Sequence, residues 1–255
     1  MTARLAKTLS SIVVATMTAG CSGYYEIPIE TPIRPKLDVS AFQRVLVAGF
    51  IAGGTEDVDG NLETTRLLRS QLRTKSEMRV IDSDVLPLMD VATENRATSG
   101  TPADSNAAVP GAIREDEDLE PYEHLFADVE YWKRIGEEYQ QPLIVTGTVM
   151  FAPQARSGIV QRDQEVYDSF GRRRVVPVRT YMERKGFVLK PRFVFIDGRT
   201  GTVLHSENFR EEVLYNANQT SPALSSYFEL MDRLIPSFLS TLSSQTIKGS
   251  RVLLQ

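Results

Sequence analysis

The chain has 255 residues, with 29 basic side chains, 33 acidic side chains and one cysteine, and its 42% hydrophobic content is ordinary for a globular protein that can bury a core. One cysteine excludes an internal disulfide, and two histidines, His124 and His205, exclude a clustered zinc site. The formal net charge of −4 argues against a nucleic-acid-binding protein, which would be strongly basic.

The N-terminus has the pattern of a secretory signal. Arg4 and Lys7 precede a short apolar stretch, residues 8–20, which falls below the roughly 20 residues of a spanning helix. The stretch ends at Cys21, and this resembles the bacterial lipobox. The resemblance implies that residues 1–20 are a cleaved lipoprotein signal peptide and that Cys21 carries palmitate and other acyl chains. Because Ser22 rather than Asp follows, it implies the periplasmic face of the outer membrane; the alternative is an ordinary signal peptide beside a free, buried cysteine.

Residues 21–41 contain three prolines and little periodicity, so we expect a lipidated, extended tether. Residues 42–255 are expected to form a single α/β domain. A valine-rich apolar run at 44–50 predicts a buried strand, an apolar stripe predicts a helix over 61–76, and a strand is expected at 78–82.

Residues 91–121 combine glycine, proline and the acidic run 115–118, which predicts a disordered acidic insert. The rest of the chain is predicted as a helix over 128–139, strands at 142–151, 187–197 and 202–214, a helix over 223–245 and a short strand at 251–254. The order β-α-β-α-β-β-β-α predicts one mixed β-sheet flanked by helices.

No chemical motif stands out. Four glycines follow the first strand without the Gly-Lys-Ser/Thr of a phosphate loop, and residues 57–61 begin a calcium-loop pattern that lacks its glycine and its final glutamate. Asp59 or Asn61 is better interpreted as a helix cap. His205 lies next to Ser206 in a strand, so their side chains point to opposite faces. The sequence therefore predicts no cofactor, metal or small-molecule substrate, and no enzyme.

Charge is segregated along the chain. Residues 94–138 hold 12 acidic and 4 basic side chains, whereas residues 151–192 hold 10 basic and 4 acidic ones. We expect residues 152–186 to form a long basic β-hairpin that projects from the sheet, although it could be only a solvated arm. The residues predicted to bind a partner, either an anionic surface or a neighbouring subunit's acidic insert, are Arg172, Arg173, Arg174, Arg179 and Arg184.

The lipobox, the order of elements and the strand around Val145-Thr146-Gly147 resemble the lipoprotein fold group of CsgG, the penicillin-binding-protein activator LpoB and the N-terminal domain of TolB, over residues 42–246. The resemblance implies a lipid-anchored binding or scaffold module for envelope assembly, secretion or activation of a partner. Two alternatives stay open: a subunit of an oligomeric CsgG-type secretion channel, and an envelope enzyme that uses His205 or His124. The enzyme requires a histidine within about 3.2 Å of a serine hydroxyl or carboxylate in a cleft.

Overall fold

The computed structural model describes residues 24–98, 113–216, 219 and 221–254. These residues belong to two compact units. The larger unit runs from Pro35 to Ser243, and the smaller one combines the chain up to Arg34 with the chain from Ser244 onward. Cys21 and the predicted signal peptide lie outside the described residues.

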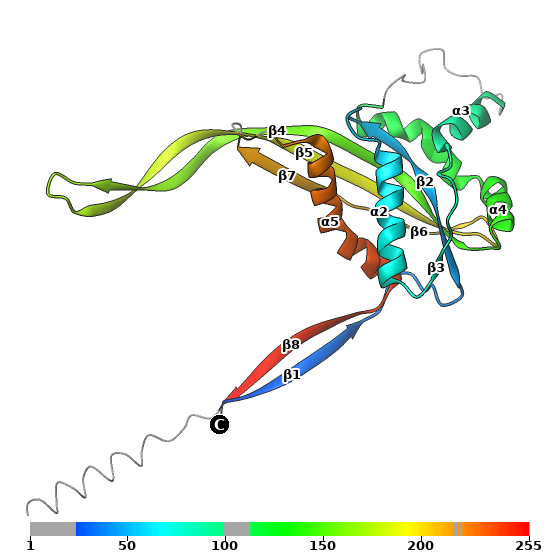
Figure 1. The fold of residues 1–255 in the computed structure, drawn as a ribbon, viewed down its shortest axis with the longest axis horizontal. Coiled ribbons are helices and arrows are strands. Elements are labelled where there is room, and N and C mark those ends of the chain that lie inside the picture. The colour runs from blue at the N-terminus through cyan, green and yellow to red at the C-terminus, as the bar shows by residue number, and fades with distance from the viewer. Residues whose placement is uncertain (1–23, 99–112, 217–218, 220, 255) are drawn as a thin grey trace, which may run out of the picture. The chain divides into compact units, whose positions relative to one another are not determined.

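The larger unit is built on a mixed sheet of six strands (Figure 1). The sheet order is β3-β2-β4-β5-β6, and β7 pairs with the outer part of β5. β2 runs parallel to both of its neighbours, whereas β5 runs antiparallel to β4, β6 and β7. The strands are β2 (Arg44–Gly54), β3 (Arg79–Val80), β4 (Leu143–Tyr167), β5 (Arg173–Asp197), β6 (Val203–Asn208) and β7 (Glu211–Asn216).

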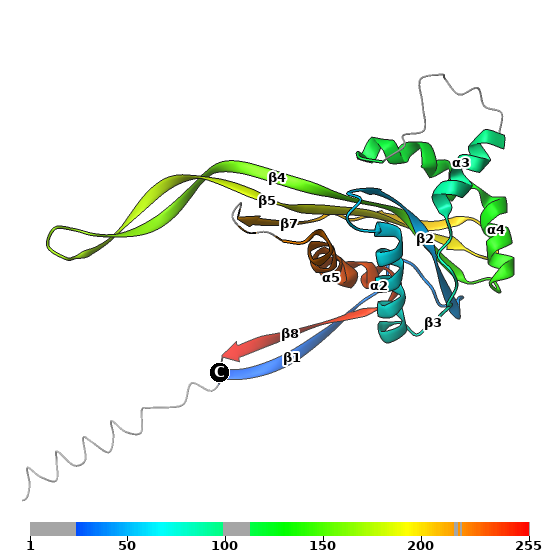
Figure 2. The same ribbon diagram turned by 45° about the horizontal axis from the view of Figure 1, so that its top comes forward.

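Helices cover both faces of this sheet, which confirms the predicted α/β class (Figure 2). α2 (Gly60–Lys75) and α5 (Ala223–Leu242) pack on one face, and α3 (Leu88–Thr98), the 3₁₀ helix η1 (Asp116–Ala127) and α4 (Val129–Glu138) pack on the other. The predicted cap of α2 is confirmed, because the carboxylate of Asp59 accepts a 3.0 Å hydrogen bond from the amide of Leu62.

Each face has its own apolar core. On the α2/α5 face, the fully buried ring of Phe193 lies 5.8 Å from Phe50, 5.5 Å from Phe209 and 4.9 Å from Phe238 between ring centroids. On the opposite face, the buried Trp132 donates its indole N–H to the carbonyl of Leu125 over 2.8 Å. This hydrogen bond satisfies the indole N–H, the one polar group that the buried ring would otherwise leave without a partner.

The structure differs from the prediction of a disordered insert at both ends of 91–121. Residues 91–98 belong to α3, and η1 begins at Asp116. The acidic side chains of η1 face outward, while its apolar side chains recur every three or four residues and are buried on the sheet. The 3₁₀ repeat of three residues produces this pattern, which the acidic run concealed. Residues 99–112 lie outside the described part of the chain. The buried residues are Leu119, Tyr122, Leu125 and Phe126.

The strand predicted over 202–214 is divided into β6 and β7. The division falls at Phe209 and Arg210, opposite Pro191 of β5. Proline has no N–H to donate to a neighbouring strand, so the ladder is interrupted there. The amide of Phe209 still donates to the carbonyl of Pro191 over 2.9 Å, which keeps both strands on the same edge of β5.

The smaller unit is an antiparallel ribbon of β1 (Tyr24–Ile33) and β8 (Gln245–Leu254). Sequence analysis placed the first segment in an unpaired tether and the second in the α/β domain. The structure instead pairs the two ends of the described chain, with Tyr24 opposite Leu254 and Ile33 opposite Gln245. α5 ends at Leu242, three residues before the predicted end, because the chain then enters this strand.

Candidate interaction surface

The projecting hairpin of the sequence prediction is confirmed as an extension of β4 and β5 beyond the helices (Figure 1). The two strands pair without a register shift over their whole length, from Leu143 opposite Asp197 to Tyr167 opposite Arg173. β7 pairs with β5 only as far as Arg184, so the hairpin has two strands from there to its tip. We call residues 155–185 the arm.

The turn at the tip of the arm is held by Asp168. Its carboxylate accepts hydrogen bonds from the amides of Arg172 and Phe170, both over 2.9 Å, and from Nε of Arg172 over 3.0 Å. The amide of Arg172 contributes most to lowering the pKa of Asp168 below its ordinary value, so the carboxylate stays ionised in its role as a cap. Gly171 supplies the positive φ of +75° that the turn needs.

The register gives the arm two faces of different chemistry. Residues directly opposite each other in an antiparallel pair share a face, and successive residues alternate between faces. Even-numbered residues of 156–166 therefore lie beside even-numbered residues of 174–184. We call this surface the arginine face, and we call the surface formed by the odd-numbered residues of 155–167 and 173–185 the mixed face.

The arginine face combines four arginines with aliphatic side chains and contains no Asp or Glu. Val166 and Val176 are each 43% exposed, so the aliphatic side chains are accessible between the charges. The arginines are Arg156, Arg162, Arg174 and Arg184, and the aliphatic residues are Val160, Val166, Val176, Val178 and Met182.

The mixed face neutralises its own charge. It carries three basic and three acidic side chains. Arg173 forms an ion pair with Glu165 at 2.8 Å, and Lys185 forms one with Glu183 at 3.2 Å. Exposed pairs of this kind contribute little to stability, about 0–1 kcal/mol each, but they leave less charge available for a partner.

Most cations of the arginine face are uncompensated. Arg162, Arg174 and Arg184 form no ion pair with any residue that the structure describes. Arg156, at the base of the arm, is bound to Glu212 at 2.9 Å, and it lies directly opposite Arg184. Like charges in directly opposite positions destabilise a strand pair. The repulsion between Arg156 and Arg184 therefore works against the pairing of the two strands, and Glu212 offsets it at the base of the arm.

The five arginines predicted from the sequence do not form one site. Arg172 donates to the carboxylate of Asp168 in the tip turn. Arg173 and Arg179 belong to the mixed face. Arg174 and Arg184 belong to the arginine face. Sequence analysis missed Arg162, which lies opposite Val178. The signal that could have found it is the turn: Asp168 and Gly171, three residues apart, fix the turn, and the turn fixes which residues of the two strands face each other.

The acidic segment is partly neutralised within the chain. Asp116 of η1 accepts from Lys190 of β5 at 2.5 Å, and Glu123 is bound to Arg192. These pairs hold η1 against the sheet near the base of the arm. Two carboxylates that the sequence suggested as targets for a neighbouring arm are therefore already engaged.

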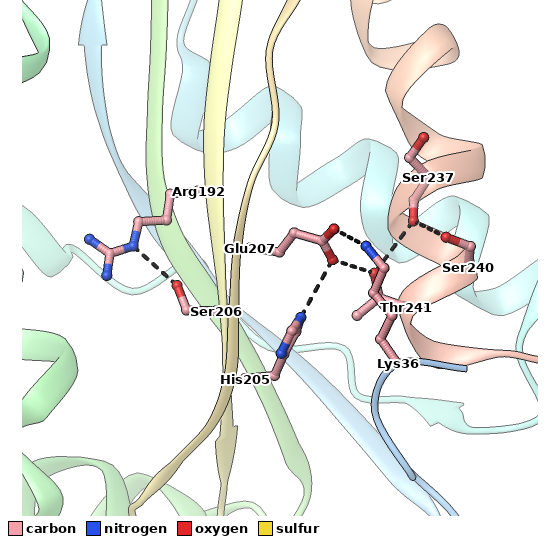
Figure 3. A network of polar contacts seen from close by, with 8 residues as sticks. All are labelled: Lys36, Arg192, His205, Ser206, Glu207, Ser237, Ser240 and Thr241. Carbon is pink, nitrogen blue, oxygen red and sulfur yellow. Dashed lines mark hydrogen bonds and ion pairs between the residues drawn. The ribbon is translucent and has the colours of Figure 1, made fainter. Parts of the chain in front are cut away.

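His205 belongs to a cluster around Glu207 (Figure 3). Glu207 is bound to Lys36, accepts from Oγ1 of Thr241 at 3.0 Å, and lies 3.4 Å from Nε2 of His205. Burial alone would raise the pKa of Glu207, but these three hydrogen bonds outweigh it and lower the pKa. The amide of Leu37 also donates to the carbonyl of Thr241 over 3.0 Å. The cluster joins the start of the larger unit to β6 and α5.

Each histidine has a polar neighbour. The carboxylate of Glu207 lies 3.4 Å from Nε2 of His205, and Ser206 points to the other face of the sheet, where its hydroxyl accepts from Nε of Arg192 at 3.1 Å (Figure 3). Nδ1 of His124 lies 2.8 Å from the carbonyl of Pro121.

The described residues bring together no group of three His, Cys, Asp or Glu side chains placed to hold a metal ion. Across 24–98, 113–216 and 221–254, every helix is too short or too polar to cross a bilayer.

Among the comparisons with known proteins, only the search of solved structures found similar proteins. No family model matches the chain, and no curated protein matches it significantly. The lipoprotein GNA1162 from Neisseria meningitidis is 11% identical over 77% of this chain and 97% of its own, with a TM-score of 0.35. The C-terminal domain of LpoB from Escherichia coli is 10% identical over 69% of this chain and 87% of its own, with a TM-score of 0.30. A neuraminyllactose-binding hemagglutinin homolog from Helicobacter pylori is 9% identical over 81% of this chain and 84% of its own, with a TM-score of 0.33.

Proposed function

We propose that this protein is a lipid-anchored binding or scaffold module of the bacterial cell envelope, and that its arm docks onto an acidic surface of a protein partner. The observation that carries the proposal is the arginine face, where exposed arginines are interspersed with aliphatic side chains and no carboxylate is present. The partner would act in envelope assembly, in secretion or as an enzyme that this module activates. We assign the chain no catalytic role of its own.

The arginine face has the two properties that a docking surface needs. Guanidinium groups bind carboxylates through two parallel hydrogen bonds, which gives orientation as well as attraction. The valines between them supply apolar contact area, which a flat charged surface would lack. An acidic protein surface offers a partner for both, because carboxylates can bind the guanidinium groups and apolar side chains can pack against the valines. Long-range attraction would also increase the rate of association.

The anchor is the lipid predicted at Cys21, which lies three residues before β1 begins at Tyr24. Lipid attachment would hold the module at the periplasmic face of a membrane, and the outer membrane is the location we propose. In that position the arm can reach a partner in the periplasm while the chain stays attached. Rings with a lumen in electron micrographs of the detergent-extracted protein would instead support the secretion-channel alternative.

Shortening the arm tests the docking role. Residues 158–182 are replaced by Asn-Gly, so that Ser157 and Glu183, which lie directly opposite each other, are joined by a two-residue turn. The change keeps the Arg156–Glu212 pair and the whole β5–β7 ladder. We expect an unchanged melting temperature, because the removed side chains lie outside both cores.

The readout is the protein that co-purifies with the tagged, lipidated chain from cross-linked envelope membranes, identified by mass spectrometry. The full-length chain should retain a partner that the shortened chain loses. Recovery of the same partner in equal amount with both chains would refute docking through the arm. Loss of binding to lipid vesicles instead of to a protein would also refute it, since the arm would then recognise a membrane.

A further inference from the structure

The ribbon of β1 and β8 has one apolar face. Ile27, Ile29 and Ile33 lie on the same side of β1 and are 36%, 43% and 46% exposed. The other side carries Glu26, the Glu30–Lys248 ion pair of 3.3 Å and two prolines, and its one exposed aliphatic side chain among the described residues is Val252, which is 54% exposed.

Among the described residues of the smaller unit, 24–34 and 244–254, no further element packs on this face. β1 and β8 are the two strands that the structure describes there, and both faces of a two-stranded ribbon are open. Isolated two-stranded ribbons are only marginally stable in water, and stability requires packing of the apolar face against something else. The exposed isoleucines are therefore a surface that a further element or a partner can cover.

The position of the ribbon in the chain favours lipid as the occupant. Only Ser22 and Gly23 separate Cys21 from Tyr24, so Tyr24 lies within about 11 Å of the residue predicted to enter the membrane. The ribbon has two acidic and two basic side chains, Glu26, Glu30, Lys248 and Arg251, and is electrically neutral. A neutral amphipathic element next to an acyl anchor is suited to the boundary between headgroups and acyl chains, where apolar area drives binding.

We propose that the isoleucine face of the β1–β8 ribbon lies in the membrane interface and forms a second membrane contact beside the lipid. Arg251 is the one charged residue on this face, and its long side chain can extend to the headgroups. The proposal rests on lipid attachment at Cys21, which belongs to the proposed function. It adds that the protein contacts the membrane along a folded element rather than through a free tether.

The test measures depth at one position on each face. In the lipidated chain the thiol of Cys21 is consumed, so Ile29→Cys and Val252→Cys each introduce a single reactive thiol, on the isoleucine face and on the opposite face. Each variant carries an environment-sensitive dye and is reconstituted into phosphatidylethanolamine–phosphatidylglycerol vesicles. We expect the dye at position 29 to emit at shorter wavelength and to be quenched by nitroxide-labelled lipid, and the dye at position 252 to be quenched by aqueous iodide.

Three results would overturn the proposal. Quenching of both dyes by iodide would place the ribbon in water. Protection of position 29 from both quenchers, with disulfide-linked dimers of the Ile29→Cys chain, would show that a second copy covers the face. Lipid quenching at both positions would remove the preference for one face.

A non-lipidated chain that begins at Ser22 separates the ribbon from the anchor. Replacing Ile27, Ile29 and Ile33 by serine should weaken its binding to the same vesicles about tenfold or more, while Val252→Ser should leave binding unchanged. Mass spectrometry of the native N-terminal peptide reports separately on Cys21. A free thiol there with isoleucine-dependent binding would refute the anchor alone, and an acylated Cys21 with isoleucine-independent binding would refute the ribbon contact alone.

Discussion

Replacing Arg162, Arg174 and Arg184 by glutamate is expected to abolish binding of the co-purified partner while the domain remains folded. The change leaves one arginine and three glutamates on a face that carries four arginines and no carboxylate. Like charges brought together at an interface cost several kcal/mol, so we expect the affinity to fall by at least about a hundredfold. Titration calorimetry with the purified partner measures the loss, and thermal unfolding checks the fold.

A matched control reverses the same number of charges on the opposite face. Arg173, Arg179 and Lys185 lie on the mixed face of the same arm, and their replacement by glutamate changes the net charge by the same amount. We expect this triple variant to lose less than about tenfold in affinity, because it leaves the arginine face intact. Equal losses in both variants would mean that the partner responds to total charge, and the face would then have no docking role.

Phe193→Ala is expected to have the largest effect on stability of any single substitution considered. Phe193 is fully buried in β5. Its ring packs against Phe50 of β2, Phe209 of the β6–β7 connection and Phe238 of α5. Removing a buried phenyl ring loses its transfer free energy and leaves a cavity, together about 3–5 kcal/mol. Urea denaturation of the non-lipidated chain measures the free energy of unfolding.

Phe170→Ala provides the control for that experiment. Phe170 is 81% exposed at the tip of the arm, where its ring lies 5.3 Å from the guanidinium of Arg172. We expect the free energy of unfolding to change by less than about 0.5 kcal/mol, as for most surface substitutions. A loss below about 1 kcal/mol for Phe193→Ala would contradict the description of Phe193 as a fully buried residue of the core on the α2/α5 face.

Local sequence patterns predicted the main elements because each depends on neighbouring residues. The apolar stripe and Asp59 placed the start of α2 within one residue, and the valine-rich run placed β2. Features that depend on residues far away in the sequence could not be predicted from local patterns. Nothing in the prolines of β1 predicts pairing with β8, since the partner strand is more than 200 residues away. The interruption after β6 likewise depends on Pro191, which lies in the neighbouring strand.

The candidate site was predictable in position but not in composition. The segregation of charge located the arm, because a count of charged residues needs no three-dimensional information. The two faces follow from the register, and a slip of one residue in one strand would have placed Arg162 beside the odd-numbered residues of β5. The contact of Arg172 with Asp168 was not predicted, because it depends on the geometry of the turn.

The most direct test of docking through the arginine face is photo-cross-linking in living cells from two adjacent positions. Val176 lies on the arginine face and Val175 on the mixed face, with exposed fractions of 43% and 54%, so a photoreactive amino acid is similarly accessible at either. We predict that irradiation links position 176 to one envelope protein and that position 175 yields little or none of that adduct. Absence of an adduct at 176, or equal yields from both positions, would contradict the proposal.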